Sequence, residues 1–171
     1  MAIWGSAALL LLLPLVAMQF TNEVNWDEAD FIVFGAMLLA ACGTYELAAR
    51  MTDNSAYRAA VGVAVAAAFI LVWMNLAVGI IGNEDNPANL MYGGVLAVGI
   101  IGAVIARFQP QGMARALMTT ALAQALVGVI ALAMGSVEAF VLTAFFAALW
   151  LTSARLFRKA AREQVPADAA P

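Results

Sequence analysis

Six long apolar segments dominate this sequence and leave few folds open to it. They lie at about residues 3–20, 31–49, 59–82, 90–106, 116–134 and 139–154. An α-helix needs roughly 20 such residues to cross a hydrocarbon core of about 30 Å. Of the 171 residues, 65% are hydrophobic and 11% are charged, which is typical of membrane proteins and not of soluble domains. The sequence therefore predicts an all-α integral membrane protein: a six-transmembrane-helix bundle in a single domain, residues 1–163.

The first apolar segment and the C-terminal residues 164–171 each lead to a prediction of their own. The first apolar segment is leucine-rich and N-terminal, so a signal peptide competes with a transmembrane helix. No Lys or Arg precedes it and no small-x-small cleavage pattern follows it, which favours an uncleaved first span. Residues 164–171 contain Pro166, Asp168 and Pro171, and we expect them to form a disordered C-terminal tail.

The charged residues predict the topology. With six spans, all eight basic residues fall on one side of the membrane: Arg50, Arg58, Arg107, Arg115, Arg155, Arg158, Lys159 and Arg162. The other side has no basic residue and holds seven of the eleven acids: Glu23, Asp27, Glu28, Asp30, Glu84, Asp85 and Glu138. Cytoplasmic loops carry an excess of Lys and Arg. We therefore expect both termini to be cytoplasmic, in a bacterial inner membrane.

Residue types that carry catalytic or metal chemistry are scarce. The sequence contains no histidine and one cysteine, Cys42, which lies inside the second apolar segment. The lack of histidine excludes histidine-held haem or zinc and any Ser-His-Asp triad. Cys42 is most simply a small packing residue. We expect no cofactor, no nucleic-acid partner and no enzyme activity.

Three polar residues inside the apolar segments are candidates for function, because polar groups are costly in a membrane. Asn75 and Gln124 lie roughly 10 and 15 Å below the acidic surface, given a helical rise of about 1.5 Å per residue. They form either an interhelical hydrogen bond or a polar pathway for a solute or ion. Glu46 lies one turn before Arg50, so a local ion pair competes with a proton-coupling role.

The most polar internal stretch, residues 82–94, connects the third and fourth spans on the acidic side. Asn86 or Asn89 is expected to cap the fourth helix, with Pro87 in its first turn. The alternative is a site for a hard cation or a partner, because many side-chain oxygens gather in one short loop. The weak metal candidates are Glu84, Asp85 and Asn86, and the wider outer-loop contact set is Asn83, Glu84, Asp85, Asn86 and Asn89.

The triplet Asn86-Pro87-Ala88 resembles one copy of the Asn-Pro-Ala motif of aquaporins, which also have six spans. That resemblance implies a water channel with two such triplets, each opening a half-helix, and a filter arginine. Here the sequence has one triplet, the span after it is long enough to cross the membrane whole, and no arginine lies on the acidic side. The sequence therefore argues against a water channel.

Two function classes are favoured, and a third stays open. The first is a non-catalytic accessory or structural subunit of a membrane assembly, favoured by small residues spaced four apart, which let helices approach closely. Such pairs include Gly99/Ala103, Gly102/Ala106 and Ala121/Ala125. The second is a small oligomeric transporter or channel that uses the bundle interior. A third is an outer-surface membrane enzyme whose acids converge: Asp27, Glu28, Asp30, Glu84 and Asp85. The expected partners are the lipid bilayer and either further copies of the chain or other membrane subunits.

Overall fold

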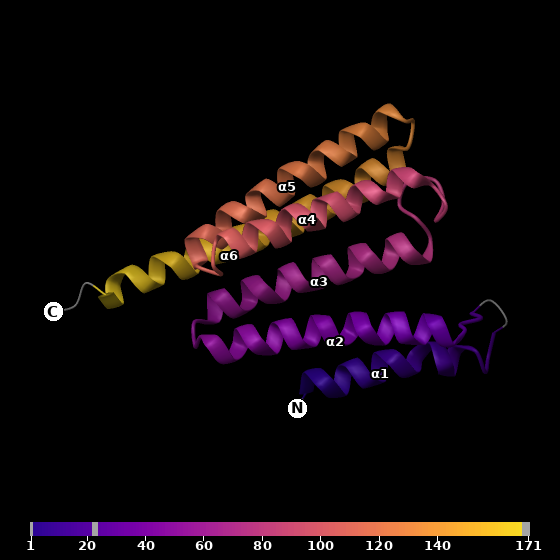
Figure 1. The fold of residues 1–171 in the computed structure, drawn as a ribbon, viewed down its shortest axis with the longest axis horizontal. Coiled ribbons are helices and arrows are strands. Elements are labelled where there is room, and N and C mark those ends of the chain that lie inside the picture. Colours follow the sequence, from indigo (N-terminus) through magenta and orange to yellow (C-terminus); the bar gives the residue numbers. More distant parts are fainter. Residues whose placement is uncertain (1, 22–23, 169–171) are drawn as a thin grey trace. The chain divides into compact units, whose positions relative to one another are not determined.

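The chain divides into two compact units, Met1–Arg50 and Met51–Pro171, in a computed structural model that describes residues 2–21 and 24–168. The first, here the two-helix unit, contains α1 (Ala2–Ala17) and α2 (Glu28–Met51, whose last residue is the first of the second unit). The second, the four-helix unit, contains the remaining elements (Figure 1), which are α3 (Ser55–Ala77), η1 (Pro87–Asn89), α4 (Leu90–Ile105), α5 (Pro110–Ala133) and α6 (Val137–Asp168).

Every secondary-structure element in the described residues is helical. Five helices are long and apolar enough to cross a membrane, namely α2, α3, η1 with α4, α5 and α6. The sixth, α1, has 16 residues and is shorter. These findings agree with the predicted multi-pass helical membrane protein. The sixth span, the cytoplasmic termini and the single domain over residues 1–163 stay predictions.

Two helix ends differ from the expected spans. α3 ends at Ala77, before the expected end at Gly82, because Gly79 and Gly82 adopt left-handed backbone conformations that break the helix. α6 does not end near Ala154 but continues for 32 residues to Asp168. Its basic residues are good helix formers, so the helix outlasts its apolar part and includes residues 164–168 of the expected tail. Residues 169–171 of that tail lie outside the described residues.

The start of α2 is fixed by local interactions. The backbone N–H of Asp30 donates to Asp27 Oδ1, and the N–H of Asp27 donates to Asp30 Oδ2, both at 3.0 Å. This reciprocal pair satisfies two of the N–H groups that a helix start leaves free. Trp26, just before the cap, packs edge-on against Phe31 and Phe34 with ring centroids 5.3 and 5.2 Å apart. Together they set where α2 begins.

α5 and α6 form the centre of the four-helix unit, and α3 packs against α6 while α4 packs against α5. Its fully buried side chains are mainly apolar and come from all four helices, for example Leu71, Val95, Ala131, Phe146 and Phe157. Tyr57 of α3 packs edge-on against Phe157 of α6, with centroids 5.0 Å apart. The unit is thus held by ordinary side-chain packing between neighbouring helices.

α4 approaches α5 closely because small residues face each other. A Cβ atom added to Gly102 would lie 2.8 Å from Ala116 Cβ, and one added to Gly112 would lie 2.7 Å from Ala106 Cβ. Real Cβ atoms do not approach so closely, so both glycines are required by the packing. Two members of the predicted small-residue pairs, Gly102 and Ala106, therefore take part in a tight helix contact.

The turn between α4 and α5 is unusual in its backbone. Arg107 and Phe108 both have positive φ, 49° and 58°, a conformation that costs an L-residue roughly 1–2 kcal/mol. The hydroxyl of Tyr57 donates to the carbonyl of Phe108 at 2.8 Å. Because Tyr57 is buried in α3, this hydrogen bond ties the turn to the helix beside it.

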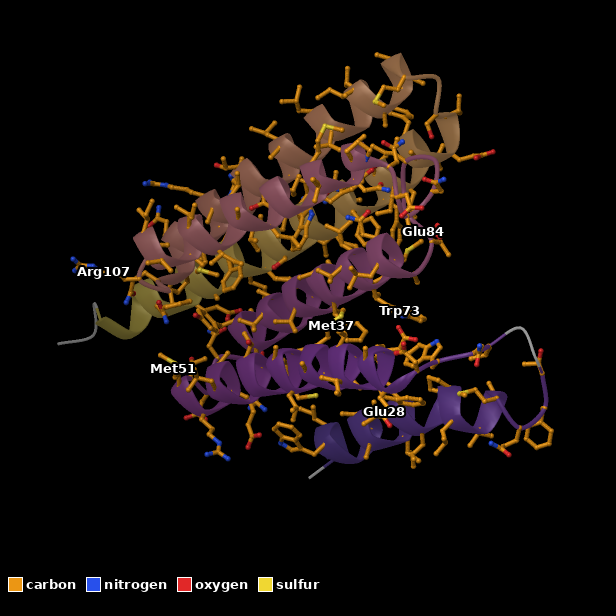
Figure 2. All side chains as sticks on the ribbon, turned by 45° about the vertical axis from the view of Figure 1, so that its right-hand side comes forward. Glu28, Met37, Met51, Trp73, Glu84 and Arg107 are labelled. Carbon is orange, nitrogen blue, oxygen red and sulfur yellow. The ribbon has the colours of Figure 1, made fainter. Side chains whose placement is uncertain are left out.

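The ends of the four-helix unit differ in charge. The helices alternate in direction, so Glu84 and Arg107 lie at opposite ends (Figure 2). The seven basic residues of this unit lie in the last part of α6, near the starts of α3 and α5, and in the α4–α5 turn. They share the Arg107 end: Arg58, Arg107, Arg115, Arg155, Arg158, Lys159 and Arg162. We call this the basic end, and the end with Glu84, Asp85 and Glu138 the acidic end.

Candidate functional site

Asn89 organises the loop between α3 and α4. Its side chain is buried, and Oδ1 accepts hydrogen bonds from the backbone N–H groups of Ile80 and Ile81 at 3.1 and 2.9 Å. Its Nδ2 donates to the carbonyl of Asn83 at 2.7 Å. One amide side chain thereby satisfies backbone groups along most of the loop, which is how a loop can enter a bundle without orphaned polar groups.

Glycine permits this loop shape. Gly79 has φ of +66°, and a Cβ atom there would lie 2.3 Å from the carbonyl carbon and oxygen of Asn83. No side chain fits at such a distance. The same carbonyl of Asn83 accepts from Asn89, so Gly79 and Asn89 support one and the same turn.

The predicted capping role is divided between the two asparagines. Asn86 Oδ1 accepts from the N–H of Ala88 at 3.0 Å and so caps η1, the turn that begins with Pro87. Asn89 occupies the position before α4 but makes no cap hydrogen bond to that helix, because its side chain points back into the loop. Asn86 thus caps the 3-10 turn that leads into α4 and not α4 itself, and Asn89 has a different structural role.

Glu84 and Asp85 are exposed at the acidic end (Figure 2, which labels Glu84). Within the described residues, no group of three or more Cys, Asp or Glu side chains is placed to hold a metal ion. Asp27, Glu28 and Asp30 belong to the two-helix unit, so their convergence with Glu84 and Asp85 stays a prediction, as does the cation or partner site. Asn83 is also exposed, and only its backbone carbonyl bonds to Asn89.

A set of buried polar side chains lies inside the four-helix unit. Tyr92 of α4 shares a hydrogen bond of 2.8 Å with Thr143 of α6. Trp150 Nε1 of α6 donates to Gln124 Oε1 of α5 at 3.3 Å. Ser153 Oγ of α6 donates to the carbonyl of Ala60 in α3 at 2.7 Å. Most of these polar atoms therefore link α6 to a neighbouring helix.

Asn75 and Gln124 do not pair with each other, and each has a different hydrogen-bond partner. Asn75 Nδ2 donates to the backbone carbonyl of Asn89 at 3.0 Å, so Asn75 belongs to the loop site. Gln124 is fully buried and pairs with Trp150. Among the described residues, two buried side-chain atoms have no hydrogen-bond partner, Asn75 Oδ1 and Gln124 Nε2. Because a buried unsatisfied amide atom is costly, each is a position where a water molecule or a solute would be stabilised.

Glu46 has two partners in the two-helix unit. It forms the predicted ion pair with Arg50, one turn further along α2. Trp4 Nε1 of α1 also donates to Glu46 Oε2. This second contact joins the start of α1 to the end of α2, so the helices run antiparallel. Cys42, on the same helix, is half-buried and has a free thiol.

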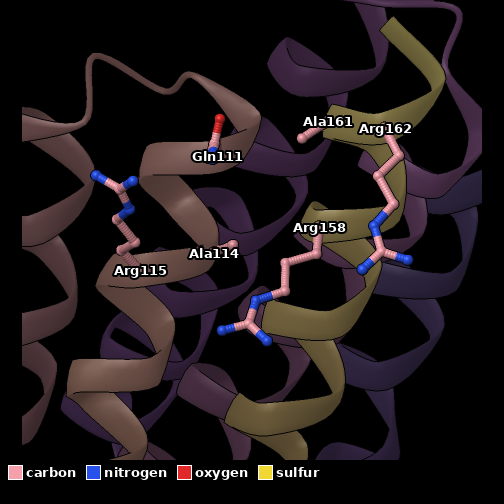
Figure 3. A pocket seen from close by; sticks show the side chains of 6 residues that line it. All are labelled: Gln111, Ala114, Arg115, Arg158, Ala161 and Arg162. Atoms are coloured by element: carbon pink, nitrogen blue, oxygen red, sulfur yellow. The ribbon is translucent and has the colours of Figure 1, made fainter. Parts of the chain in front are cut away.

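At the basic end, the start of α5 and the last part of α6 form a hollow of about 390 Å³. We call it the arginine pocket (Figure 3), and its lining residues are Gln111, Ala114, Arg115, Arg158, Ala161 and Arg162. From the sequence, these arginines predicted only the membrane topology and not a pocket. Arg158 and Arg162 are four residues apart, and α6 continues beyond its apolar part. From that spacing the sequence could have placed both side chains on one face of the helix.

Comparisons of the chain with protein-family models, with curated proteins and with solved structures gave no significant match. In the loop site, Asn89 satisfies backbone groups and Asn75 Oδ1 has no partner. In the helix core, Gln124 Nε2 has no partner, and the arginine pocket is lined by three arginine residues.

Proposed function

We propose that the protein is a non-catalytic accessory or structural subunit of a membrane assembly, with α4 as the helix that meets the partner. The observation that carries this proposal is the difference between the two faces of α4. One face packs against α5, and the other presents small residues that no atom of the four-helix unit approaches.

The packed face of α4 runs along Tyr92, Val95, Gly99 and Gly102. Tyr92 and Val95 are buried, and added Cβ atoms at Gly99 and Gly102 would press on α5. The opposite face runs through Gly93, Gly94 and Ala97, all exposed, and continues with Ile100, Ile101 and Val104. A Cβ atom added to Gly93 or Gly94 would have no neighbour within 4 Å.

This face has the composition that membrane helices use for association. Lipid tails are as apolar as leucine, so helices in a membrane associate through close packing and not through the hydrophobic effect. Gly93 and Ala97 are four residues apart and form a small-xxx-small pair, which permits close backbone approach. The pattern repeats the one that already joins α4 to α5, which supports a second helix contact on this side.

A double substitution, Gly93→Leu with Gly94→Leu, tests the proposal. Two leucines would hold a partner helix away, so we expect co-migration with a larger assembly, after mild solubilisation from the native membrane, to fall about tenfold. Ala125→Leu makes a similar small-to-large change on the exposed side of α5 and is the matched control. Equal co-migration of both variants and the parent chain would contradict docking through α4.

A small oligomeric transporter is the second candidate. It is favoured by the unsatisfied buried atoms of Asn75 and Gln124, since a polar solute would find hydrogen-bond partners there. Two results together would favour this candidate over the first: a small homo-oligomer in native electrophoresis, and a solute flux that is lost in Gln124→Leu.

We propose in addition that six helices cross a bacterial inner membrane with the basic end in the cytoplasm. The positive-inside rule supports this orientation. The antiparallel run of α1 along α2 supports a sixth span, although 16 residues extend only about 24 Å.

A further inference from the structure

Three arginine residues line one hollow at the basic end. Arg158 and Arg162 lie one turn apart on α6, and Arg115 lines the hollow from the start of α5 (Figure 3). Gln111, Ala114 and Ala161 form the rest of the wall. Figure 3 shows the guanidinium of Arg115 directed away from α6, so the room for a ligand lies beside Arg158 and Arg162, between α6 and the start of α5.

No carboxylate within the described residues neutralises these three arginines. The ion pairs found there join Arg50 to Glu46 and Lys159 to Glu163. Glu163, the acid beside the pocket on α6, is directed elsewhere: its Oε1 lies 3.8 Å from Lys159 Nζ, and its Oε2 accepts from Asn54 Nδ2 at 2.8 Å. Like charges gathered without a counter-charge repel one another, so an anion in the pocket would be stabilised.

The helix start adds a second favourable contribution. Gln111, in the pocket wall, is the second residue of the 24-residue helix α5. The first N–H groups of a helix have no partner within it, and its N-terminal end carries a partial positive charge. Gln109, the cap residue, makes no side-chain cap hydrogen bond that would occupy these donors. Helix starts of this kind bind phosphate groups.

We propose that the arginine pocket binds a phosphate group, carried by the headgroup of an anionic phospholipid or by a free phosphate anion. Guanidinium groups match phosphate oxygens with paired hydrogen bonds. The pocket lies just beyond the apolar parts of α5 and α6, which is the level of the headgroups if these helices cross a bilayer. This assignment is independent of docking through α4.

The test compares three full-length proteins in lipid nanodiscs. The parent chain, the triple variant Arg115→Gln/Arg158→Gln/Arg162→Gln, and the control Arg58→Gln/Arg107→Gln are reconstituted with phosphatidylglycerol and phosphatidylcholine. Native mass spectrometry then counts the phosphatidylglycerol molecules retained. We expect the triple variant to lose about tenfold or more in retention and the control, which changes basic residues of the same end outside the pocket, to keep it.

A second arm separates the two phosphate sources. Inorganic phosphate is added to the protein in neutral detergent, and thermal unfolding is followed by circular dichroism. Stabilisation of the parent chain and the control by phosphate, with no retention of phosphatidylglycerol, assigns the pocket to a free anion. The proposal is overturned if neither phosphatidylglycerol nor inorganic phosphate distinguishes the triple variant from the parent. If the triple variant does not fold, Arg158→Gln alone replaces it in both arms.

Discussion

The side chain of Asn89 holds the loop between α3 and α4 in place through hydrogen bonds to its backbone. Its side chain bonds to three backbone positions of the loop, and its own carbonyl accepts from Asn75. Removing the side chain would leave two buried N–H groups and one carbonyl to find other partners. Unsatisfied buried groups cost about 1–3 kcal/mol each, so a single substitution here is expected to be severe.

We therefore expect Asn89→Ala to lower the free energy of unfolding by about 2 kcal/mol or more. Unfolding of the purified protein in detergent, followed by circular dichroism, measures this change. Asn83→Ala is the matched control in the same loop. Its side chain is exposed, so its effect should stay within about 0.5 kcal/mol. Equal losses in the two variants would show that Asn89 does not organise the loop.

The sequence identified this loop but not the role of each asparagine. Asn83, Asn86 and Asn89 are equivalent as residue types, and all could cap a helix or face a partner. Which side chain turns inward depends on the left-handed backbone at Gly79 and Gly82, and a glycine in a sequence does not reveal its φ. The cap at Asn86 was predictable because Pro87 follows it.

At the scale of helices, the apolar segments located the elements well and their ends poorly. The expected span 59–82 continued through Val78, Ile80 and Ile81, which are apolar but belong to the loop. Two of them, Ile80 and Ile81, are buried by that loop, so hydrophobicity alone cannot separate them from a helix. For α6 the predicted end was too early, since the helix continues beyond the apolar segment.

The link between α5 and α6 makes a prediction at this scale. Gln124→Leu removes an unsatisfied amide but leaves Trp150 Nε1 without its acceptor, so we expect a loss of about 1 kcal/mol. The double variant Gln124→Leu/Trp150→Phe removes both partners and should recover part of that loss. Unfolding free energies of the four proteins then give a coupling of about 0.6 kcal/mol, the average for membrane helices.

Thr119→Ala serves as the control for this cycle. Thr119 lies on α5 as well, but it is exposed and its hydroxyl donates to Arg115 in its own helix. It should show no coupling to Trp150→Phe beyond experimental error. A coupling of zero between Gln124 and Trp150 would mean that their hydrogen bond does not contribute to stability.

For the whole molecule, the charge asymmetry of the sequence is reproduced as a polarity of the four-helix unit. Alternating helix directions bring the basic residues to one end because the loops between successive helices alternate in charge. This part followed from the sequence. The division into Met1–Arg50 and Met51–Pro171 did not, since it depends on which helices make contacts and not on their composition.

The orientation in the membrane can be measured with single cysteines. In a Cys42→Ala background, Glu84→Cys should react with a membrane-impermeant maleimide in intact spheroplasts, and Arg107→Cys only after permeabilisation. A peptide tag fused before residue 1 should be protected in intact spheroplasts if α1 crosses the membrane. Labelling of Arg107→Cys in intact spheroplasts would reverse the orientation, and an accessible tag would exclude the sixth span.

α6 is one continuous helix of 32 residues, which makes it about 48 Å long, well beyond a hydrocarbon core of roughly 30 Å. Its apolar part and the polar part that follows therefore move together as one rigid helix. The hydrogen bond from Ser153 to Ala60 and the ring contact of Phe157 with Tyr57 lie near the middle of the helix and join it to α3. A sideways load on the outer turns of α6 is consequently transmitted to α5 and α3, the two helices that pack against it.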